Sequence, residues 1–283
     1  MRGLITYFVF GSWWVAICAA SMGLLTWYEL TKSWWNAPIF VFILGSTLVV
    51  YNLNMLSGLK ELRKMGTHSE RHHWCMENEL AMKVTLGIGL LLSAISIWFL
   101  NPIIWLLMIP LGFLALAYAA PIVRRNADKI RIREIGLWKI FIIAIVWAGM
   151  TAILPAVELL GWHQVETPHT WMLATERAIF ILAITIPFDI RDLVNDAKKD
   201  VQTLPSVLTW QWAVVLSVFL IGAFICLLTL RLGLDGRFMG YAVSSIIAAV
   251  GLAFATPNRN DMYCSFWIEG TMLLQFFAVL LLA

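Results

Sequence analysis

The feature that most constrains this chain is a series of apolar runs, each about 20 residues long and carrying few charges. At about 1.5 Å per residue, a helix of that length matches a hydrocarbon core of roughly 30 Å. Hydrophobic residues make up 61% of the 283 residues and charged residues only 13%, against about 25% charged in an ordinary soluble domain. The bilayer is therefore the expected solvent.

We expect about nine spans, which are separated by breaks such as Asn101-Pro102 and Thr256-Pro257. The expected spans cover residues 4–30, 36–58, 82–99, 102–120, 136–160, 171–189, 207–229, 237–256 and 262–282. The runs lack the two-residue alternation of a membrane β-barrel, so the expected fold class is all-α, a polytopic membrane bundle. No hydrophilic segment is long enough for a second domain, and residues 1–283 are expected to form one transmembrane domain.

Basic residues are unevenly distributed between the two sides of this bundle. With the N-terminus inside, only four of the 20 Lys and Arg fall on the outer side: Lys32, Arg177, Arg231 and Arg237. The positive-inside rule then places the N-terminus in the cytoplasm and the C-terminus on the opposite side, with a bacterial inner membrane as the expected location. The net charge of +3 is spread over several loops, so the expected partners include membrane lipid and exclude nucleic acid.

The most informative polar segment follows the sixth expected span. Asp189, Asp192 and Asp196 are spaced i, i+3, i+7, which places them on one helical face. Carboxylates stacked in this way repel one another, so something positive should lie against them. Mg²⁺ is one candidate, because it takes oxygen ligands and joins carboxylates to substrate phosphates. The alternative is a solvated acidic loop that is neutralised by Arg191, Lys198 and Lys199.

The run D-I-R-D-x-x-x-D at 189–196, followed by Thr203-Leu204-Pro205, resembles the second aspartate-rich motif of the UbiA-type intramembrane prenyltransferases. The expected number of spans, the chain length and the position of the motif are also similar to that family. Asp200 stands where a glycine is common in the motif. The resemblance implies a Mg²⁺ site at Asp189, Asp192 and Asp196, with a polyprenyl diphosphate and a lipid-soluble acceptor as substrates.

The first aspartate-rich motif of that family should fall near the end of the second expected span. Aligning the motif there places its aspartates on Tyr51, Asn54 and Gly58, so no carboxylate survives. Asn52 and Asn54 could still offer neutral carbonyl oxygens to a cation, but a neutral ligand gives up most of the Coulomb attraction that holds Mg²⁺. This first motif is therefore degenerate, and only the second motif provides carboxylates for the expected metal site.

Basic residues gather in the loops on the same side as the acidic stripe. The candidates for binding a diphosphate are Arg63, Lys64, Arg71, Arg131, Arg133 and Lys139. The resemblance implies this role for Lys139 and the neighbouring arginines, because the equivalent loops cap the active-site mouth in the family. Ordinary positive-inside topology and contact with anionic lipid explain the same residues equally simply.

Two further groups could line a site. Glu269 lies inside the last expected span, where a carboxylate should face either a cavity or a structural partner in the bundle. His68, His72 and His73 resemble a metal-ligand spacing, but they stand in a polar segment without a cysteine pair, where a solvated loop is the simpler interpretation.

Two functions remain open at this point. The first is a Mg²⁺-dependent prenyltransferase, which transfers a polyprenyl group from its diphosphate to a lipophilic acceptor. The second is a non-catalytic relative that binds lipid, diphosphate or a partner protein, and the degenerate first motif favours it. A transporter is a weaker third option, since neither an internal repeat nor paired broken helices are evident.

Overall fold

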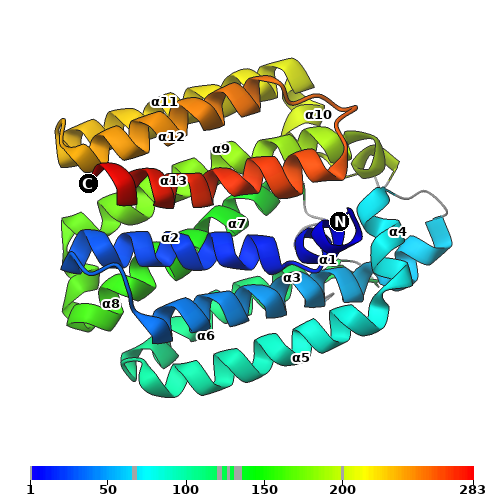
Figure 1. Ribbon diagram of the computed structural model, residues 1–283. Coiled ribbons are helices and arrows are strands. Elements are labelled where there is room, and N and C mark those ends of the chain that lie inside the picture. The colour runs from blue at the N-terminus through cyan, green and yellow to red at the C-terminus, as the bar shows by residue number, and fades with distance from the viewer. Residues whose placement is uncertain (1, 66–68, 120–122, 126–127, 131–135, 199–200) are drawn as a thin grey trace.

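The computed structural model describes residues 2–65, 69–119, 123–125, 128–130, 136–198 and 201–283. Seven helical segments there are long and apolar enough to cross a membrane, and a bent pair near the N-terminus adds an eighth. The shorter apolar helix α6 (Ile103–Ala119) completes the nine expected spans. The prediction of an all-α polytopic bundle is therefore confirmed (Figure 1).

Most spans are single helices, two are composite, and the first is the bent pair of α1 (Arg2–Phe10) and α2 (Trp13–Thr31). The single helices are α3 (Ala37–Met65), α5 (Glu79–Ser96), α6, α9 (Pro168–Lys198), α11 (Trp210–Leu232) and α12 (Gly236–Ala253). The composite spans are α7 (Trp138–Ala148) with η3 (Gly149–Ile153) and α8 (Leu154–Leu160), and η5 (Tyr263–Ile268) with α13 (Glu269–Leu282). Both η3 and η5 are π-helical turns.

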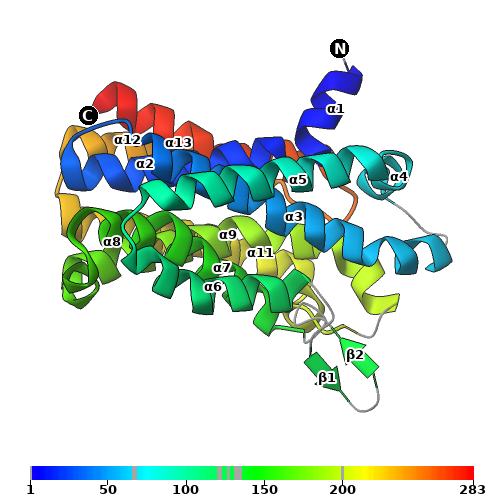
Figure 2. The same cartoon turned by 90° about the horizontal axis from the view of Figure 1, so that it is seen from below.

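Short elements connect these spans. They are α4 (Glu70–Glu77), α10 (Leu204–Leu208), the 3₁₀ turns η1 (Ile97–Phe99) and η4 (Trp162–Glu166), and an antiparallel hairpin of β1 (Val123–Arg125) and β2 (Asp128–Ile130). The hairpin lies at the same end of the bundle as α4 (Figure 2). The N-terminus lies toward that end and the C-terminus lies at the opposite end (Figure 1).

Helices α3 and α5 approach each other through glycines. A Cβ atom on Gly89 would lie 2.8 Å from the Gly45 carbonyl oxygen, and one on Gly45 would lie 2.9 Å from the Gly89 carbonyl oxygen. Small residues at such a contact let two backbones pack closely, which is a main source of helix association in lipid. The outer face of the bundle is apolar, with Leu91 and Phe219 60% and 68% exposed.

A buried ionic cluster joins the helices at the end opposite to α4. Arg231 of α11 forms ion pairs with Glu29 of α2 and, at 2.8 Å, with Glu176 of α9. The Tyr241 hydroxyl of α12 donates to Glu29 as well. Four helices thus share one network of charges, and its acidic groups already have partners within the bundle.

Candidate active site

The acidic stripe lies on the C-terminal part of α9, a helix that continues beyond the expected end of its span and ends at Lys198. Pro187 lies within this helix and has no N–H to donate to the Ala183 carbonyl. The Ser217 hydroxyl of α11 donates to that carbonyl instead, at 2.6 Å. Helix α11 therefore satisfies the backbone group that Pro187 leaves unpaired just before the stripe.

Lys139, in the first turn of α7, is the counter-ion of two members of the stripe. Its Nζ atom lies 2.9 Å from Asp189 Oδ1 and 2.8 Å from Asp196 Oδ2. The side chains of Lys139 and Asp189 are only 11% and 7% exposed, so these ion pairs have little contact with water. Lys139 therefore supplies the positive charge that was expected to lie against the stacked carboxylates.

Arg191 pairs with the remaining carboxylate of the stripe. Its Nε and Nη2 atoms donate to the two oxygens of Asp192 at 2.8 and 2.9 Å, a bidentate geometry. Its Nη1 atom lies 3.1 Å from Asp261, which belongs to the connection between α12 and η5. The Asp192 side chain is nevertheless 37% exposed and lines a cavity, so a ligand can still reach it.

Helix α4 covers the charged end of this cavity. The Ser69 side chain caps the helix by accepting from the His72 backbone N–H at 3.3 Å. The Arg71 backbone N–H donates to Asp261 at 2.8 Å. The same carboxylate therefore contacts both Arg191 and the first turn of α4, and the Arg71 and His72 side chains line the cavity.

Arg71 and His72 differ in charge. Among the described residues the Arg71 guanidinium has no ion-pair partner, and its buried Nε has no hydrogen bond. Burial lowers the pKa of His72 to about 4, although Asp192 and Asp261 act in the opposite direction. His72 is thus neutral near pH 7, whereas Arg71 has a positive charge that is available to an anion.

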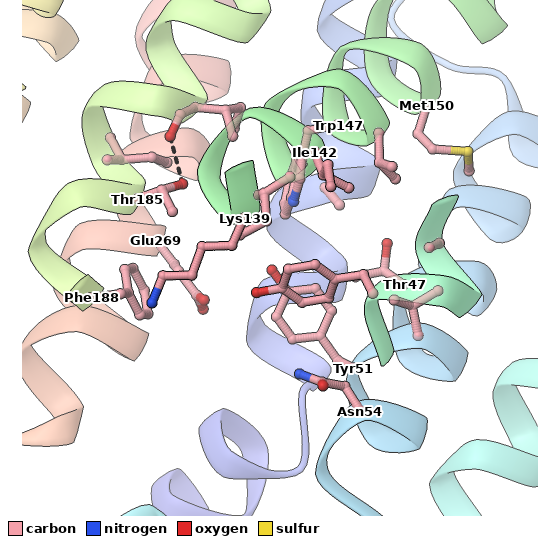
Figure 3. A pocket seen from close by; sticks show the side chains of 18 of the residues that line it. Thr47, Tyr51, Asn54, Lys139, Ile142, Trp147, Met150, Thr185, Phe188 and Glu269 are labelled. Atoms are coloured by element: carbon pink, nitrogen blue, oxygen red, sulfur yellow. Dashed lines mark hydrogen bonds between the residues drawn. The ribbon is translucent and has the colours of Figure 1, made fainter. Parts of the chain in front are cut away.

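The cavity has a volume of about 330 Å³ and extends from these charged groups into the membrane-spanning part of the bundle. Apolar side chains from several spans line its inner part, among them Ile43, Leu111, Trp147, Met150 and Met272. Lys139 and Glu269 point into the space from one side, and Tyr51 lies opposite (Figure 3). A charged mouth above an apolar pocket suits an amphiphile with an anionic head.

The charged residues that line the cavity do not give it a net positive charge. Three are cationic, namely Arg71, Lys139 and Arg191, and four are acidic, namely Asp189, Asp192, Asp261 and Glu269. A diphosphate would enter a site whose cations are largely paired already. Extra positive charge must therefore come with it.

Only some residues of the degenerate first motif line the cavity. Asn54 lines it together with Asp189 and Asp192, whereas Asn52 and Gly58 do not. The Asn52 amide instead donates to the Leu48 carbonyl at 2.8 Å and contacts the Gly11 carbonyl at 3.5 Å. The first span bends by 55° between Phe10 and Trp13, and Asn52 is buried against this break, away from the cavity.

The expected diphosphate-binding residues are also divided. Lys139 lines the cavity. Arg63 does not, because it lies on α3 and pairs at 2.6 Å with Glu79 while 51% exposed. The Lys64 side chain, together with Arg131 and Arg133, lies outside the described residues, as does His68. The structure places Arg71 and His72 at the cavity and adds Asp261, which the sequence patterns did not indicate as a site residue.

The donor set fits a metal only in combination with a ligand. Among the described residues, no three His, Cys, Asp or Glu side chains form a group that could hold a metal ion. Asp189 and Asp192 nevertheless line one cavity, and an ionised carboxylate accepts more hydrogen bonds or metal contacts than its single cationic partner uses. Because Mg²⁺ commonly takes one or two carboxylates plus substrate phosphates, these residues fit a site that the substrate completes.

The family model of the UbiA prenyltransferase family matches residues 76–262 of this chain. The chain belongs to the UbiA prenyltransferase family. The matched range includes the acidic stripe and begins after the α3 segment in which the first motif is degenerate. Membership of the UbiA family supports a prenyltransferase-type enzyme, and no curated protein matches the chain in sequence.

Solved structures of UbiA homologues share this fold. A homologue from Aeropyrum pernix K1, solved in its apo form, is 13% identical, with a TM-score of 0.71 over 94% of this chain and 97% of its own. A homologue from Archaeoglobus fulgidus, solved with GPP and Mg²⁺ bound, is 11% identical, with a TM-score of 0.63 over 98% of this chain and 99% of its own. A digeranylgeranylglyceryl phosphate synthase is 16% identical, with a TM-score of 0.57 over 100% and 99%.

Proposed function

We propose that this UbiA-family protein, over residues 1–283 as one unit, is a Mg²⁺-dependent prenyltransferase that transfers a polyprenyl group from its diphosphate to a lipophilic acceptor. One observation carries the proposal: Asp189, Asp192 and Arg71, which has no ion-pair partner among the described residues, lie at the mouth of an apolar cavity within the spans. The GPP and Mg²⁺ that are bound to the Archaeoglobus fulgidus homologue support the same assignment.

The charge balance of the cavity gives Mg²⁺ a physical role. With four acidic groups against three cations in the lining of the cavity, a diphosphate needs a divalent cation to enter. Asp189 and Asp192 would hold the ion, with Asp196 kept close by Lys139. When bound, Mg²⁺ supplies the charge stabilisation that a departing diphosphate requires.

The residues of the chain perform the remaining tasks. Arg71 donates charge-assisted hydrogen bonds to the diphosphate, and Arg191 orients Asp192 through its bidentate contact. As the allylic C–O bond breaks, the electron pair leaves with the diphosphate, and the apolar wall around Trp147 and Met150 keeps water from the carbocation. The acceptor then traps that carbocation.

A second candidate function rests on the degenerate first motif. Typical members of the family have two acidic motifs, whereas here Asn54 lines the cavity in place of a carboxylate and Lys139 and Arg191 pair with the stripe. A non-catalytic relative that binds a diphosphate, a lipid or a partner protein would keep these features and release no product.

A direct assay separates the two functions. Purified protein in detergent would be incubated with labelled geranyl, farnesyl and geranylgeranyl diphosphates, Mg²⁺ and a panel of lipophilic acceptors. The proposed enzyme releases diphosphate and forms a prenylated product, and EDTA stops both. Mg²⁺-dependent binding without diphosphate release from any donor would favour the non-catalytic relative.

We also propose that the chain resides in a bacterial inner membrane, with the charged mouth and the N-terminus in the cytoplasm. The opposite positions of the termini and the basic residues around α4 support this orientation (Figure 1). Glu70 is an exposed residue of α4, so Glu70→Cys should react with an impermeant maleimide only after the cells are opened. Labelling of intact cells at that position, but not of the parent protein, would reverse the orientation.

A further inference from the structure

Glu269 is a buried carboxylate within a span, and the proposed binding of the diphosphate and Mg²⁺ gives it no role. It is 7% exposed, lies at the start of α13 and lines the cavity. Among the described residues it has no hydrogen bond and no ion pair, and the charges that act on it most are those of Arg71 and Arg191. An ionisable side chain at such a depth normally marks a ligand pathway or a functional site.

The local backbone fixes the direction of Glu269. The π-helical turn η5 ends one residue before it, and such turns are frequent at functional sites because they rotate the following residues relative to a regular α-helix. The Trp14 indole of α2 donates to the Phe266 carbonyl at 3.0 Å and stacks on the Phe266 ring at 4.7 Å. The turn that aims Glu269 at the cavity is therefore supported by a neighbouring helix.

Four aliphatic hydroxyl groups that line the cavity are engaged by their own helices. Ser46, Thr47, Thr151 and Thr185 each donate to a backbone carbonyl four residues earlier, at 2.7 to 2.8 Å. Figure 3 shows this bond for Thr185. Each of these hydroxyls has a single proton, which its own helix already engages. Glu269 thus remains available to a hydrogen-bond donor from outside the chain.

The prenyl donor cannot be that partner. Neither its ionised diphosphate nor its hydrocarbon tail carries a hydrogen-bond donor. The partner must lie within the membrane-spanning part of the cavity and must bring an O–H or N–H group. An anionic acceptor would also add negative charge beside the diphosphate, in a site without net positive charge.

We infer that Glu269 binds the acceptor, that this acceptor is a neutral lipid-soluble molecule with a nucleophilic O–H or N–H group, and that Glu269 takes its proton. This inference rests on the proposed transferase function. In the step, the allylic C–O bond of the donor breaks and its electron pair leaves with the diphosphate. The acceptor oxygen or nitrogen forms the new bond to carbon, and its proton passes to the Glu269 carboxylate.

A pair of matched probes tests the acceptor class without any turnover. We would measure the binding of 4-hexylphenol and 4-hexylbenzoate to the purified full chain by titration calorimetry in detergent. The two probes share a tail and ring and differ in the charge of the polar group. We expect the phenol to bind at least about tenfold more tightly, which is typical of one hydrogen bond to a charged group.

The variant Glu269→Gln should reduce that preference to about twofold or less, while Glu158→Gln should preserve it. Glu158 is a matched control because it is a half-buried carboxylate at the far end of another span, where it accepts from the Asn101 backbone N–H and does not line the cavity. Equal or tighter binding of the benzoate to the unmodified chain overturns the inference, even if Glu269→Gln fails to fold. An undiminished preference for the phenol in a folded Glu269→Gln protein overturns it as well.

A transfer assay separates this inference from the proposed function. Glu269→Gln should keep Mg²⁺-dependent binding of prenyl diphosphate but form product about 100-fold more slowly, as expected for a lost proton acceptor. Equal product formation by the variant overturns the role of Glu269 alone. If the unmodified chain forms no product but prefers the phenol through Glu269, the transferase proposal fails and the acceptor-type binding site stands.

Discussion

The ammonium group of Lys139 lies 2.9 Å from the Asp189 carboxylate, at the point where the first turn of α7 meets the C-terminal part of α9. Replacing Lys139 by Met leaves the buried Asp189 and Asp196 without their counter-ion. Breaking a buried pair in this way typically costs about 3–5 kcal/mol. We therefore expect a clear fall in the thermal unfolding temperature of Lys139→Met in detergent.

Mg²⁺ should restore part of that loss, because the two carboxylates that Lys139 releases become ligands for a cation. The control is Lys83→Met, since Lys83 pairs with Glu79 while 58% exposed and such surface pairs contribute about 0–1 kcal/mol. An unchanged unfolding temperature for Lys139→Met would show that this ion pair does not hold α7 against α9.

Sequence patterns could locate the spans and the acidic stripe because both depend on local spacing. Apolar runs of membrane length predict helices whatever their neighbours are, and carboxylates at i, i+3 and i+7 share a face wherever the helix lies. Helix α9 continues to Lys198, beyond the expected end of the span at residue 189, which agrees with one helical face for the stripe and not with a solvated polar loop. Ion pairs with Lys139 and Arg191 offset that polarity in the folded chain.

The partners of each side chain could not be predicted in the same way. Asn52 and Asn54 are two residues apart on α3, yet only Asn54 lines the cavity, because Asn52 lies against the bend of the first span at Gly11. Arg63 and Arg71 looked equivalent in one basic segment, but only Arg71 is placed at the cavity by α4. Such choices depend on contacts between segments that are far apart in the sequence.

Arg71 should account for a large share of diphosphate binding. Its guanidinium faces the cavity without an ion-pair partner among the described residues, so a phosphate can take its hydrogen bonds at little cost. We expect Arg71→Gln to weaken the binding of farnesyl diphosphate in the presence of Mg²⁺ by about 10- to 100-fold. Arg63→Gln should change it by less than about threefold, because that charge is exposed and paired elsewhere. Equal losses in the two variants would mean that the basic segment acts only through its overall charge.

His72 should make the stability of the protein depend on pH. Its pKa in the folded protein is about 4, well below the ordinary value of 6.5, because burial disfavours the charged form. Between these two values the unfolded chain binds more protons than the folded chain, so stability falls as the pH falls from 6.5 to 4. The stabilisation that is lost over this window is at most about 3 kcal/mol.

The variant His72→Gln removes this contribution. Without Mg²⁺, the unfolding temperature of the unmodified protein should fall more steeply between pH 7 and pH 4.5 than that of His72→Gln. The comparison subtracts the effect of Asp192 and Asp261, which both proteins retain. Parallel curves would contradict the burial of a neutral His72 against the cavity.

The most direct test of the proposed site is whether Mg²⁺ and the prenyl diphosphate bind together. The acidic stripe supplies negative charge but not a complete shell of ligands for Mg²⁺. Thermal unfolding would be measured with Mg²⁺ alone, with farnesyl diphosphate alone and with both, for the unmodified chain, Asp192→Asn and the control Asp235→Asn. Asp235 is the N-cap of α12 and does not line the cavity. We predict a large stabilisation only when both are present, its loss in Asp192→Asn and its retention in Asp235→Asn. If Asp192→Asn keeps the full joint stabilisation, the acidic stripe is not the metal site.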